Sequence, residues 1–344
     1  MKWLALFLVP ALGACGGAAG GGDGSSGSTA SNVYITQDVI FEPQLSQNIF
    51  QFPTTATGSV SPTQSLKGPA GVTFNGLAVD TTGILYVGGT ITSSSPSNGA
   101  EILIYAPGAS GNATPSRTIV GPSTGLGGFG MSSVYGLALD TSGNMYVSSF
   151  VNVGGILYPG VSIFPATANG DVAPTKVIAG SATTLNAFLP GQIAVDSANR
   201  IYTEGGSLPQ PDSVLIFDSS SIGNGPPSST ISGPKTMIDD VVGLALDNAG
   251  NIYVANGTAA GASTSSILVF SAGSTGNVAP IRTVSGSATT MVGLTNLSVD
   301  RDGNVYVINL LNVLKFAPTS SGNVPPSATI SFVGFSGVSG IAAQ

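Results

Sequence analysis

The chain has 344 residues, of which 7% are charged, with 9 Lys and Arg against 16 Asp and Glu and no His. Without His, Ser-His-Asp catalysis, Cys-His catalysis and His-ligated zinc are excluded. With so few basic residues no nucleic-acid partner is expected. The one Cys, Cys15, has no partner for a disulfide within the chain. This composition favours a non-catalytic protein, although it does not decide whether the chain is an enzyme.

Residues 1–14 have the pattern of a lipoprotein signal peptide. Lys2 supplies a positive charge, and the apolar run that follows is too short to span a bilayer. The run ends in a Leu-Gly-Ala triplet directly before Cys15, which resembles a bacterial lipobox. That resemblance implies cleavage before Cys15 and acylation of this residue, with palmitate among the acyl groups. An ordinary secretory signal with a chance Cys is the alternative.

Residues 15–31 are expected to form the lipidated Cys and a tether. Residues 16–31 are dominated by Gly, Ser and Ala, a composition that cannot build a core and behaves as a flexible linker. Its r.m.s. reach is about 20 Å. The residue after Cys15 is Gly16 and not Asp, which by the same resemblance indicates the outer membrane. The sequence therefore predicts a protein that is lipid-anchored in the bacterial outer membrane.

From residue 32 onward the chain repeats one pattern. A short apolar segment ends in Asp and is followed, after a turn, by Tyr. The five Asp residues are 60, 56, 51 and 53 positions apart, a period typical of propellers and solenoids. The five pairs are Asp80 with Tyr86, Asp140 with Tyr146, Asp196 with Tyr202, Asp247 with Tyr253 and Asp300 with Tyr306.

The rest of each repeat predicts two further strands. A third strand ends in an aromatic residue, a Gly-Asn-x-x-Pro loop follows in four copies, and a short strand comes next. This second half of the repeat occurs six times, whereas the first half occurs five times complete. Residues 340–343 resemble the start of the missing half and residues 32–35 its continuation. We therefore predict an all-β, six-bladed β-propeller over residues 32–344, with four-stranded antiparallel blades and with closure by pairing of the N- and C-terminal strands.

The sequence Gly-Leu-Ala-Val-Asp-x-x-Gly-Asn-Ile-Tyr-Val, read across the copies, resembles the NHL repeat family of six-bladed propellers. The resemblance extends over residues 32–344 and implies the propeller fold. It implies less about function, because this family and its neighbours include protein-binding, RNA-binding and peptide-binding modules as well as lactonases and lyases. The lyase-type relatives use His in their sites, and this chain contains none.

Two short motifs match catalytic or cofactor-binding patterns. Residues 121–125 read Gly-Pro-Ser-Thr-Gly, as in a nucleophile elbow, and residues 125–130 match a dinucleotide fingerprint. Neither lies in the strand-turn-helix context that its chemistry requires, and no His is present to activate the Ser. Both are interpreted as loops of the repeat.

Four polar residues are candidates for a ligand or metal site at the channel face of the propeller. They are Glu204, Asp239, Asp240 and Asn256, which depart from the repeat or stand where loops begin. Carboxylate and amide oxygens suit Ca²⁺, although the sequence names no metal and requires no cofactor. The alternatives are a solvated Asp pair, an Asn that bonds its own loop, and a Glu that faces solvent.

Two functional hypotheses follow. The first is a membrane-anchored, non-catalytic binding or scaffold propeller on the bacterial cell envelope, with an unidentified protein or glycan bound at the channel face. The alternative is a divalent-cation-dependent hydrolase of the lactonase or esterase type, similar to gluconolactonase-like propellers.

Overall fold

The structure is a computed structural model that describes residues 31–37, 47–91, 99–126, 134–185, 190–206, 212–257, 265–332 and 337–344. The signal peptide predicted at residues 1–14, Cys15 and residues 16–30 lie outside the described residues. No helix in the described ranges is long and apolar enough to cross a membrane.

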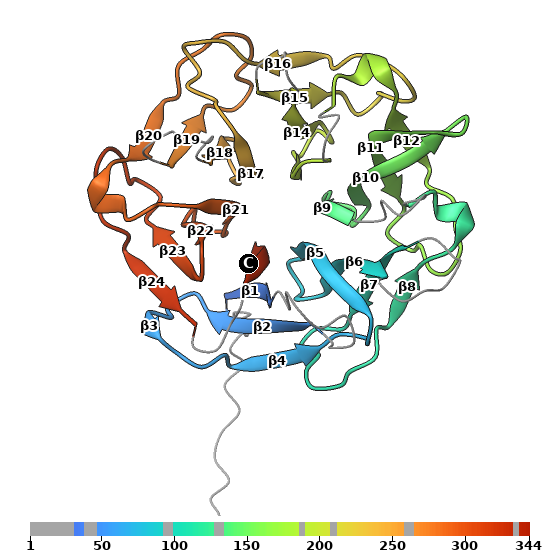
Figure 1. Cartoon of the computed structure of the whole chain (residues 1–344), viewed down its shortest axis with the longest axis horizontal. Coiled ribbons are helices and arrows are strands. Elements are labelled where there is room, and N and C mark those ends of the chain that lie inside the picture. The colour runs from blue at the N-terminus through green and yellow to red at the C-terminus, as the bar shows by residue number, and fades with distance from the viewer. Residues whose placement is uncertain are drawn as a thin grey trace, which may run out of the picture.

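Six antiparallel sheets are arranged as the blades of a ring (Figure 1), which confirms the predicted fold. Within each sheet the four main strands run from the centre of the ring outward. Blade 1 contains, in this order, β25 (Val338–Ala343), β1 (Asn32–Gln37), β2 (Asn48–Pro53) and β4 (Gln64–Lys67). Blade 2 contains β5 (Val72–Val79), β6 (Leu85–Ile91), β7 (Ala100–Tyr105) and β8 (Arg117–Ile119).

The remaining blades follow in chain order. Blade 3 contains β9 (Val134–Leu139), β10 (Met145–Val153), β11 (Ile156–Phe164) and β12 (Lys176–Ala179). Blade 4 contains β13 (Ile193–Val195), β14 (Ile201–Gly205), β15 (Ser213–Phe217) and β16 (Ser229–Ile231). Blade 5 contains β17 (Val241–Leu246), β18 (Ile252–Asn256), β19 (Ser266–Phe270) and β20 (Arg282–Ser285). Blade 6 contains β21 (Leu294–Val299), β22 (Val305–Asn309), β23 (Asn312–Phe316) and β24 (Ala328–Ser331).

Short elements complete the described chain. Strand β3 (Gly58–Ser59) pairs in parallel with β24 and so adds a fifth strand to blade 6. Three single-turn 3-10 helices follow outer strands: η1 (Pro122–Thr124), η2 (Ser181–Thr183) and η3 (Ser287–Thr289).

The two ends of the chain close the ring in blade 1. Strand β25 supplies the innermost position and pairs antiparallel with β1, with Val33 opposite Ala343 and Ile35 opposite Ile341. This is the closure predicted from residues 32–35 and 340–343. Because a complete ring leaves no inner strand unpaired, it removes the long exposed sheet edges of an open array.

The hydrophobic core lies between neighbouring blades. Among its largest members are the aromatic residues at or near the end of the third strand of each blade, where the repeat predicts them. All six of these side chains have less than 2% of their surface exposed: Phe52, Tyr105, Phe164, Phe217, Phe270 and Phe316. Alternate residues of one strand pack against opposite neighbours, since Ile102 and Ile104 contact blade 3 whereas Leu103 and Tyr105 lie on the side of blade 1.

A parallel β-bridge joins each blade to the next. The Gly of the loop between strands three and four pairs in parallel with the outer strand of the preceding blade. At one boundary the Gly170 amide donates to the Thr118 carbonyl oxygen at 2.7 Å, and the Val120 amide donates to the Gly170 carbonyl oxygen at 3.2 Å. The same bridge forms at all six boundaries: Leu66 with Gly111, Ile119 with Gly170, Ile178 with Gly223, Ile231 with Gly276, Val284 with Gly322, and Ile330 with Gly58. The Gly of the repeated loop is therefore part of the contact between blades.

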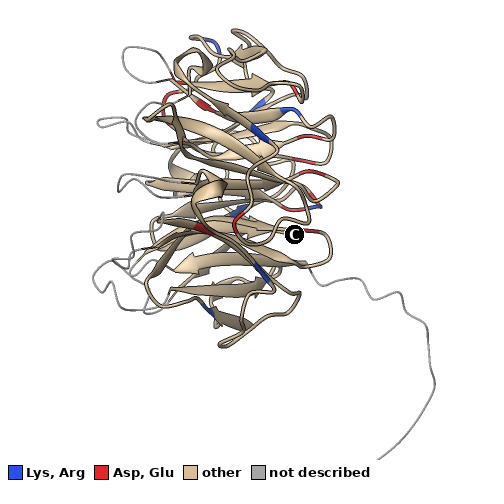
Figure 2. Ribbon diagram, turned by 90° about the vertical axis from the view of Figure 1, so that its right-hand side faces the viewer, with Lys and Arg blue, Asp and Glu red and all other residues tan. Residues whose placement is uncertain are grey.

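The ring has two different faces. On the turn face the inner strands of blades 2 to 6 pass into the second strands, and the Asp turns gather there, at the right-hand edge of Figure 2. On the loop face, at the other end, the chain leads into each inner strand and the second and third strands are connected. Strand β1 begins on the turn face, where the Gln344 amide donates to the Asn32 carbonyl oxygen at 3.0 Å.

Candidate functional site

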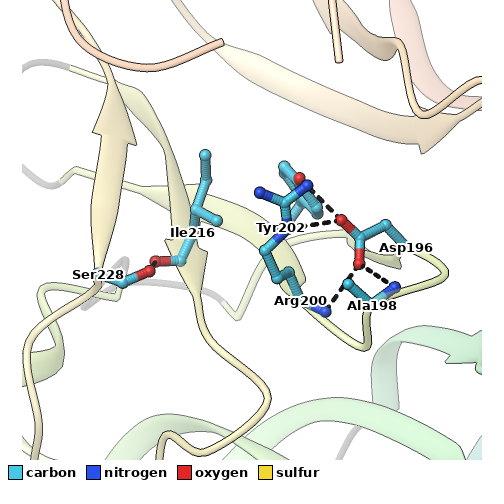
Figure 3. Close-up of polar contacts among 6 residues, drawn as sticks. All are labelled: Asp196, Ala198, Arg200, Tyr202, Ile216 and Ser228. Atoms are coloured by element: carbon cyan, nitrogen blue, oxygen red, sulfur yellow. Dashed lines mark hydrogen bonds and ion pairs between the residues drawn. The ribbon is translucent and has the colours of Figure 1, made fainter. Parts of the chain in front are cut away.

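The Asp turns of the turn face use both oxygens of the carboxylate within the fold. In blade 4, Asp196 Oδ1 accepts hydrogen bonds from the amides of Ala198 and Arg200, both at 2.9 Å (Figure 3). Asp196 Oδ2 accepts from Arg200 Nε at 2.7 Å and from the Tyr202 hydroxyl at 3.1 Å. The contact between Asp196 and Arg200 is the one ion pair among the described residues. The carboxylate therefore ties the turn to the Tyr of the next strand.

These contacts shift the proton affinities of the turn. Burial acts to raise the pKa of Asp196, but the hydrogen bonds from Arg200 and Ala198 outweigh it and lower this pKa. Burial, followed by the charge of Asp196, raises the pKa of Tyr202 to about 12. Both groups are thus held in one protonation state around neutral pH, Asp196 ionised and Tyr202 neutral, which suits a structural role.

Three other blades repeat this turn with Asn in place of Arg200. In blade 6, Asp300 Oδ2 accepts from Asn304 Nδ2 at 2.8 Å and from the Tyr306 hydroxyl at 3.0 Å. Asp140 and Asp247 make the same contacts in blades 3 and 5. These four carboxylates therefore have a structural role, because their oxygens accept hydrogen bonds from their own turns.

The second half of the repeated Gly-Asn motif holds the turn after the preceding outer strand. Asn224 Oδ1 accepts from the Ala182 amide at 2.7 Å, and Asp171 Oδ1 accepts from the Ser123 amide at 2.7 Å. Gly is required at position 121 for two reasons: a Cβ there would lie 2.4 Å from the Asp171 carboxylate, and the φ of Gly121 is +134°. The motif at residues 121–125 thus forms a 3-10 turn that is hydrogen-bonded to the next blade, and not a strand-turn-helix elbow.

A cavity of about 240 Å³ lies at the centre of the ring and is lined by the inner strands of all six blades, including Leu77, Leu137 and Ile341. Another, of about 450 Å³, opens on the turn face among the turns of blades 3, 4 and 5, beside Asp140, Asp196 and Asp247. Because these three carboxylates already bond their own turns, the turn-face cavity offers few free acceptors.

The four predicted site residues lie in, or directly before, strands of blades 4 and 5. Glu204 lies in β14 against Gly191, where a Cβ would come within 2.4 Å of Glu204 Oε2. Asn256 is buried at the end of β18, and its amide bonds the segment that leads into β17. Its Nδ2 donates to the Met237 carbonyl oxygen at 2.7 Å, and its Oδ1 accepts from the Asp239 amide at 3.2 Å.

A cluster of three carboxylates lies beside this segment. Asp239 is exposed and Asp240 half-buried, and both act on Asp212, which precedes β15 in the neighbouring blade. Burial, then the charge of Asp239, raises the pKa of Asp240. Burial, then the charges of Asp240 and Asp239, raises the pKa of Asp212. We call Asp212, Asp239 and Asp240 the acidic cluster.

Sequence reasoning missed Asp212. It stands outside the repeated motif, directly after the connection between strands two and three of blade 4, so no periodic signal marks it. The available signal was topological: connections between strands two and three share a face with the segments that lead into inner strands. The backbone adds a second feature that sequence does not show, because Asp240 has a φ of +130°, a strained value for a residue with a Cβ.

The described residues contain no group of three or more His, Cys, Asp or Glu arranged to hold a metal ion. Calcium binding by Glu204, Asp239, Asp240 and Asn256 therefore stays a sequence-based prediction.

Glu101 is a buried carboxyl on the third strand of blade 2. Its side chain is 8% exposed, and burial raises its pKa. The other blades have small or amide residues at this position of the third strand: Asn48, Gly160, Ser213, Ser266 and Asn312. No ion pair of the described residues includes Glu101. Ionised Glu101 is thus a cost to the fold that the neutral acid does not carry.

We expect Glu101→Gln to stabilise the protein at neutral pH. Because the pKa of Glu101 is raised in the folded state, its contribution to the free energy of unfolding is fully present below the unfolded pKa, about 4.3. This contribution is lost as the pH rises through the folded pKa, and Gln at this position does not lose it. Urea unfolding across a pH series should show a variant that is more stable at neutral pH and equal to the parent in acid. Asp218→Asn, which removes an exposed carboxylate, serves as the control. A difference in stability between Glu101→Gln and the parent that persists in acid would contradict this explanation.

No protein-family model and no curated protein sequence matches the chain. Solved structures with similar folds are nevertheless found. A protein of unknown function from Bacteroides caccae superposes with a TM-score of 0.58 at 11% identity, over 92% of this chain and 99% of its own. A Lactobacillus plantarum protein gives 0.52 at 13% identity, over 92% and 100%. The WD40 domain of Toxoplasma gondii coronin gives 0.50 at 13% identity, over 83% and 78%.

Identities this low show a common fold and nothing about activity. Together with the six closed blades, these similarities place the chain among the β-propellers.

Proposed function

We propose that the chain is a lipid-anchored, non-catalytic binding propeller of the bacterial cell envelope. Cys15 is the acylated residue, residues 16–31 form the tether, and the loop face receives a protein or glycan. The lipobox-like triplet before Cys15 and the Gly-rich composition of the tether support the anchor.

The observation that carries the binding function is the unequal use of polar groups on the two faces. On the turn face, carboxylates such as Asp196 and Asp300 bond their own turns. Two cations outside the turns bond the neighbouring blade: Arg282 Nη1 donates to the Ser320 carbonyl oxygen at 3.3 Å, and Lys176 Nζ donates to the Ser219 carbonyl oxygen at 2.6 Å. The acidic cluster has no such partner among the described residues. The carboxylates of the acidic cluster, on the loop face, are therefore available to a ligand.

The direction of β1 supports the same arrangement. Because β1 begins on the turn face, a tether that precedes it leaves the propeller there. The attachment point is then on the turn face, and an anchor at Cys15 leaves the loop face accessible to a partner.

The raised pKa values of Asp212 and Asp240 are the observation in favour of the hydrolase alternative, because perturbed carboxyls occur at catalytic sites. Full-length protein in detergent should be assayed against lactones and esters with Ca²⁺, Mg²⁺, Mn²⁺ or Zn²⁺. We expect no turnover and no cation-dependent rise in melting temperature. A bound cation at a hundredfold excess over its Kd would stabilise the fold by about 2.7 kcal/mol, an effect that is easily seen.

Variants make this test specific. Turnover that disappears in Glu204→Gln or Asp240→Asn, and persists in Asp218→Asn on the exposed loop after β15, would replace the binding function with the hydrolase.

A further inference from the structure

The turn between β22 and β23 breaks the usual rule for a two-residue hairpin. Asn309 pairs with Asn312, so Leu310 and Leu311 make the turn. Leu310 has a φ of +57°, where tight hairpins favour Asn or Gly. The two side chains are 58% and 44% exposed. The sequence thus accepts both backbone strain and exposed apolar surface, a local conflict that is expected where a residue serves function.

Apolar surface continues from this turn to the neighbouring segment. The Leu310 amide donates to the Gly293 carbonyl oxygen at 3.1 Å, and a Cβ on Gly293 would lie 2.9 Å from the Leu310 side chain. Val292, next to Gly293, is 63% exposed. Asn309 fixes this segment, because its Oδ1 accepts from the Val292 amide at 2.8 Å. We call Val292, Leu310 and Leu311 the apolar patch.

The adjacent blade 5 presents two members of the acidic cluster, Asp239 and Asp240, on the same face. Inner strands β17 of blade 5 and β21 of blade 6 lie side by side. Asp239 and Asp240 precede β17 as Val292 and Gly293 precede β21, so the two groups occupy matching places on neighbouring blades. Met237, on the same segment as the acids, repeats the conflict seen at Leu310, with a φ of +61° and 54% exposure.

The described loop face is mainly acidic beside blades 4 and 5. Its inner-strand approaches and its connections between strands two and three contain three acids, Asp212, Asp239 and Asp240, and one basic residue, Lys235, within the described ranges. A fourth acid, Glu204, lies near the end of β14. Such a surface attracts cations and repels anionic lipid headgroups. Charge complementarity therefore favours a basic partner over a membrane.

We propose that blades 5 and 6 bind a polypeptide segment that has Lys or Arg beside apolar side chains. Its cations lie against Asp239 and Asp240, and its apolar side chains cover Leu310 and Leu311. This inference rests on the proposed binding function, for which it names the class of partner. Its failure can be distinguished from failure of the proposed function, because lipid anchoring and lactone turnover are measured in separate experiments.

The test uses full-length protein in nonionic detergent and three fluorescent peptides of equal length. One alternates Lys with Leu, one Glu with Leu, and one Lys with Ser, and peptide anisotropy is corrected for empty micelles. Only the Lys-Leu peptide should bind, with an affinity that falls as salt is added. Mass spectrometry should find the peptide intact.

Matched variants separate a binding role from a structural one. Leu310→Gly should weaken binding about tenfold, as the loss of an interfacial anchor does. It should leave the melting temperature unchanged or raise it, because Gly relieves the positive φ. Asp239→Asn combined with Asp240→Asn should weaken binding similarly and reduce its salt dependence. Ile281→Ser, at an exposed apolar residue between β19 and β20, is the control and should bind as the parent does.

Three results would overturn the proposal. Equal binding of the Glu-Leu peptide would remove the charge argument, and full binding by Leu310→Gly would remove the apolar patch. Sedimentation of the lipid-free Cys15→Ser protein with phosphatidylglycerol vesicles, lost in Leu310→Gly, would assign the patch to a membrane instead.

Discussion

Removal of residues 338–344 is expected to prevent stable closure of the ring. The deletion takes away β25, and with it the buried side chains of Val338 and Ile341. Burial of such side chains contributes about 1.5–3 kcal/mol each. Hydrogen bonds contribute about 1 kcal/mol each, and those lost include Gly340 amide to Thr36 Oγ1 at 2.7 Å. Since domains of ordinary stability have about 5–15 kcal/mol in total, most of the stability is removed.

Circular dichroism during heating and light scattering will measure the effect. We expect a large fall in melting temperature, together with aggregation through the opened edge of β1. A matched control deletes seven residues from the Gly-rich tether, at 17–23, and should melt as the parent does. If the C-terminal truncation melts at the parental temperature, β25 does not close the ring.

The C-terminal residue also reaches into the neighbouring blade. Gln344 Nε2 donates to the Asp80 carbonyl oxygen at 3.0 Å, and Asn296 Nδ2 donates to the Ser339 carbonyl oxygen at 3.2 Å from the other side. Strand β25 is therefore bonded on both sides, by blade 2 and by blade 6. Its loss affects two blade boundaries as well as blade 1.

The fold could be predicted because its signal is repeated. An Asp followed by a turn and Tyr at intervals near 50 residues defines a blade, and the incomplete copies at 32–35 and 340–343 indicate how the ring closes. What the repeat does not reveal is contact between copies. Asp171 bonds the amide of Ser123, which is 48 positions earlier. A motif shows that this loop is constrained, but only the assembled ring shows which blade it holds.

The candidate site was less predictable because it lies where the repeat stops. Asp239 and Asp240 were recognisable as departures from the pattern, whereas Asp212 belongs to no pattern. Leu310 is an ordinary apolar residue in sequence, and only its backbone conformation and exposure make it unusual. Function on a propeller depends on such side chains, which tertiary structure gathers from separate blades.

Substitution of the predicted lipidation site should change where the protein resides. In Cys15→Ser the acyl chains have no attachment point, and each buried methylene contributes about 0.8 kcal/mol to membrane binding. We expect palmitate labelling to disappear and the protein to move from the membrane fraction to the soluble fraction. Adding Ser25→Cys to this variant places a Cys in the tether, away from the apolar run, and should not restore labelling.

The proposed function depends most on a propeller held by lipid at its N-terminus, and the intact mass of the protein extracted from membranes tests this directly. We predict a chain that begins at Cys15 and carries the added mass of a diacylglyceryl group and an amide-linked acyl chain. A chain that begins at Met1, or one with an unmodified Cys15, would contradict the lipid anchor and with it the proposed function.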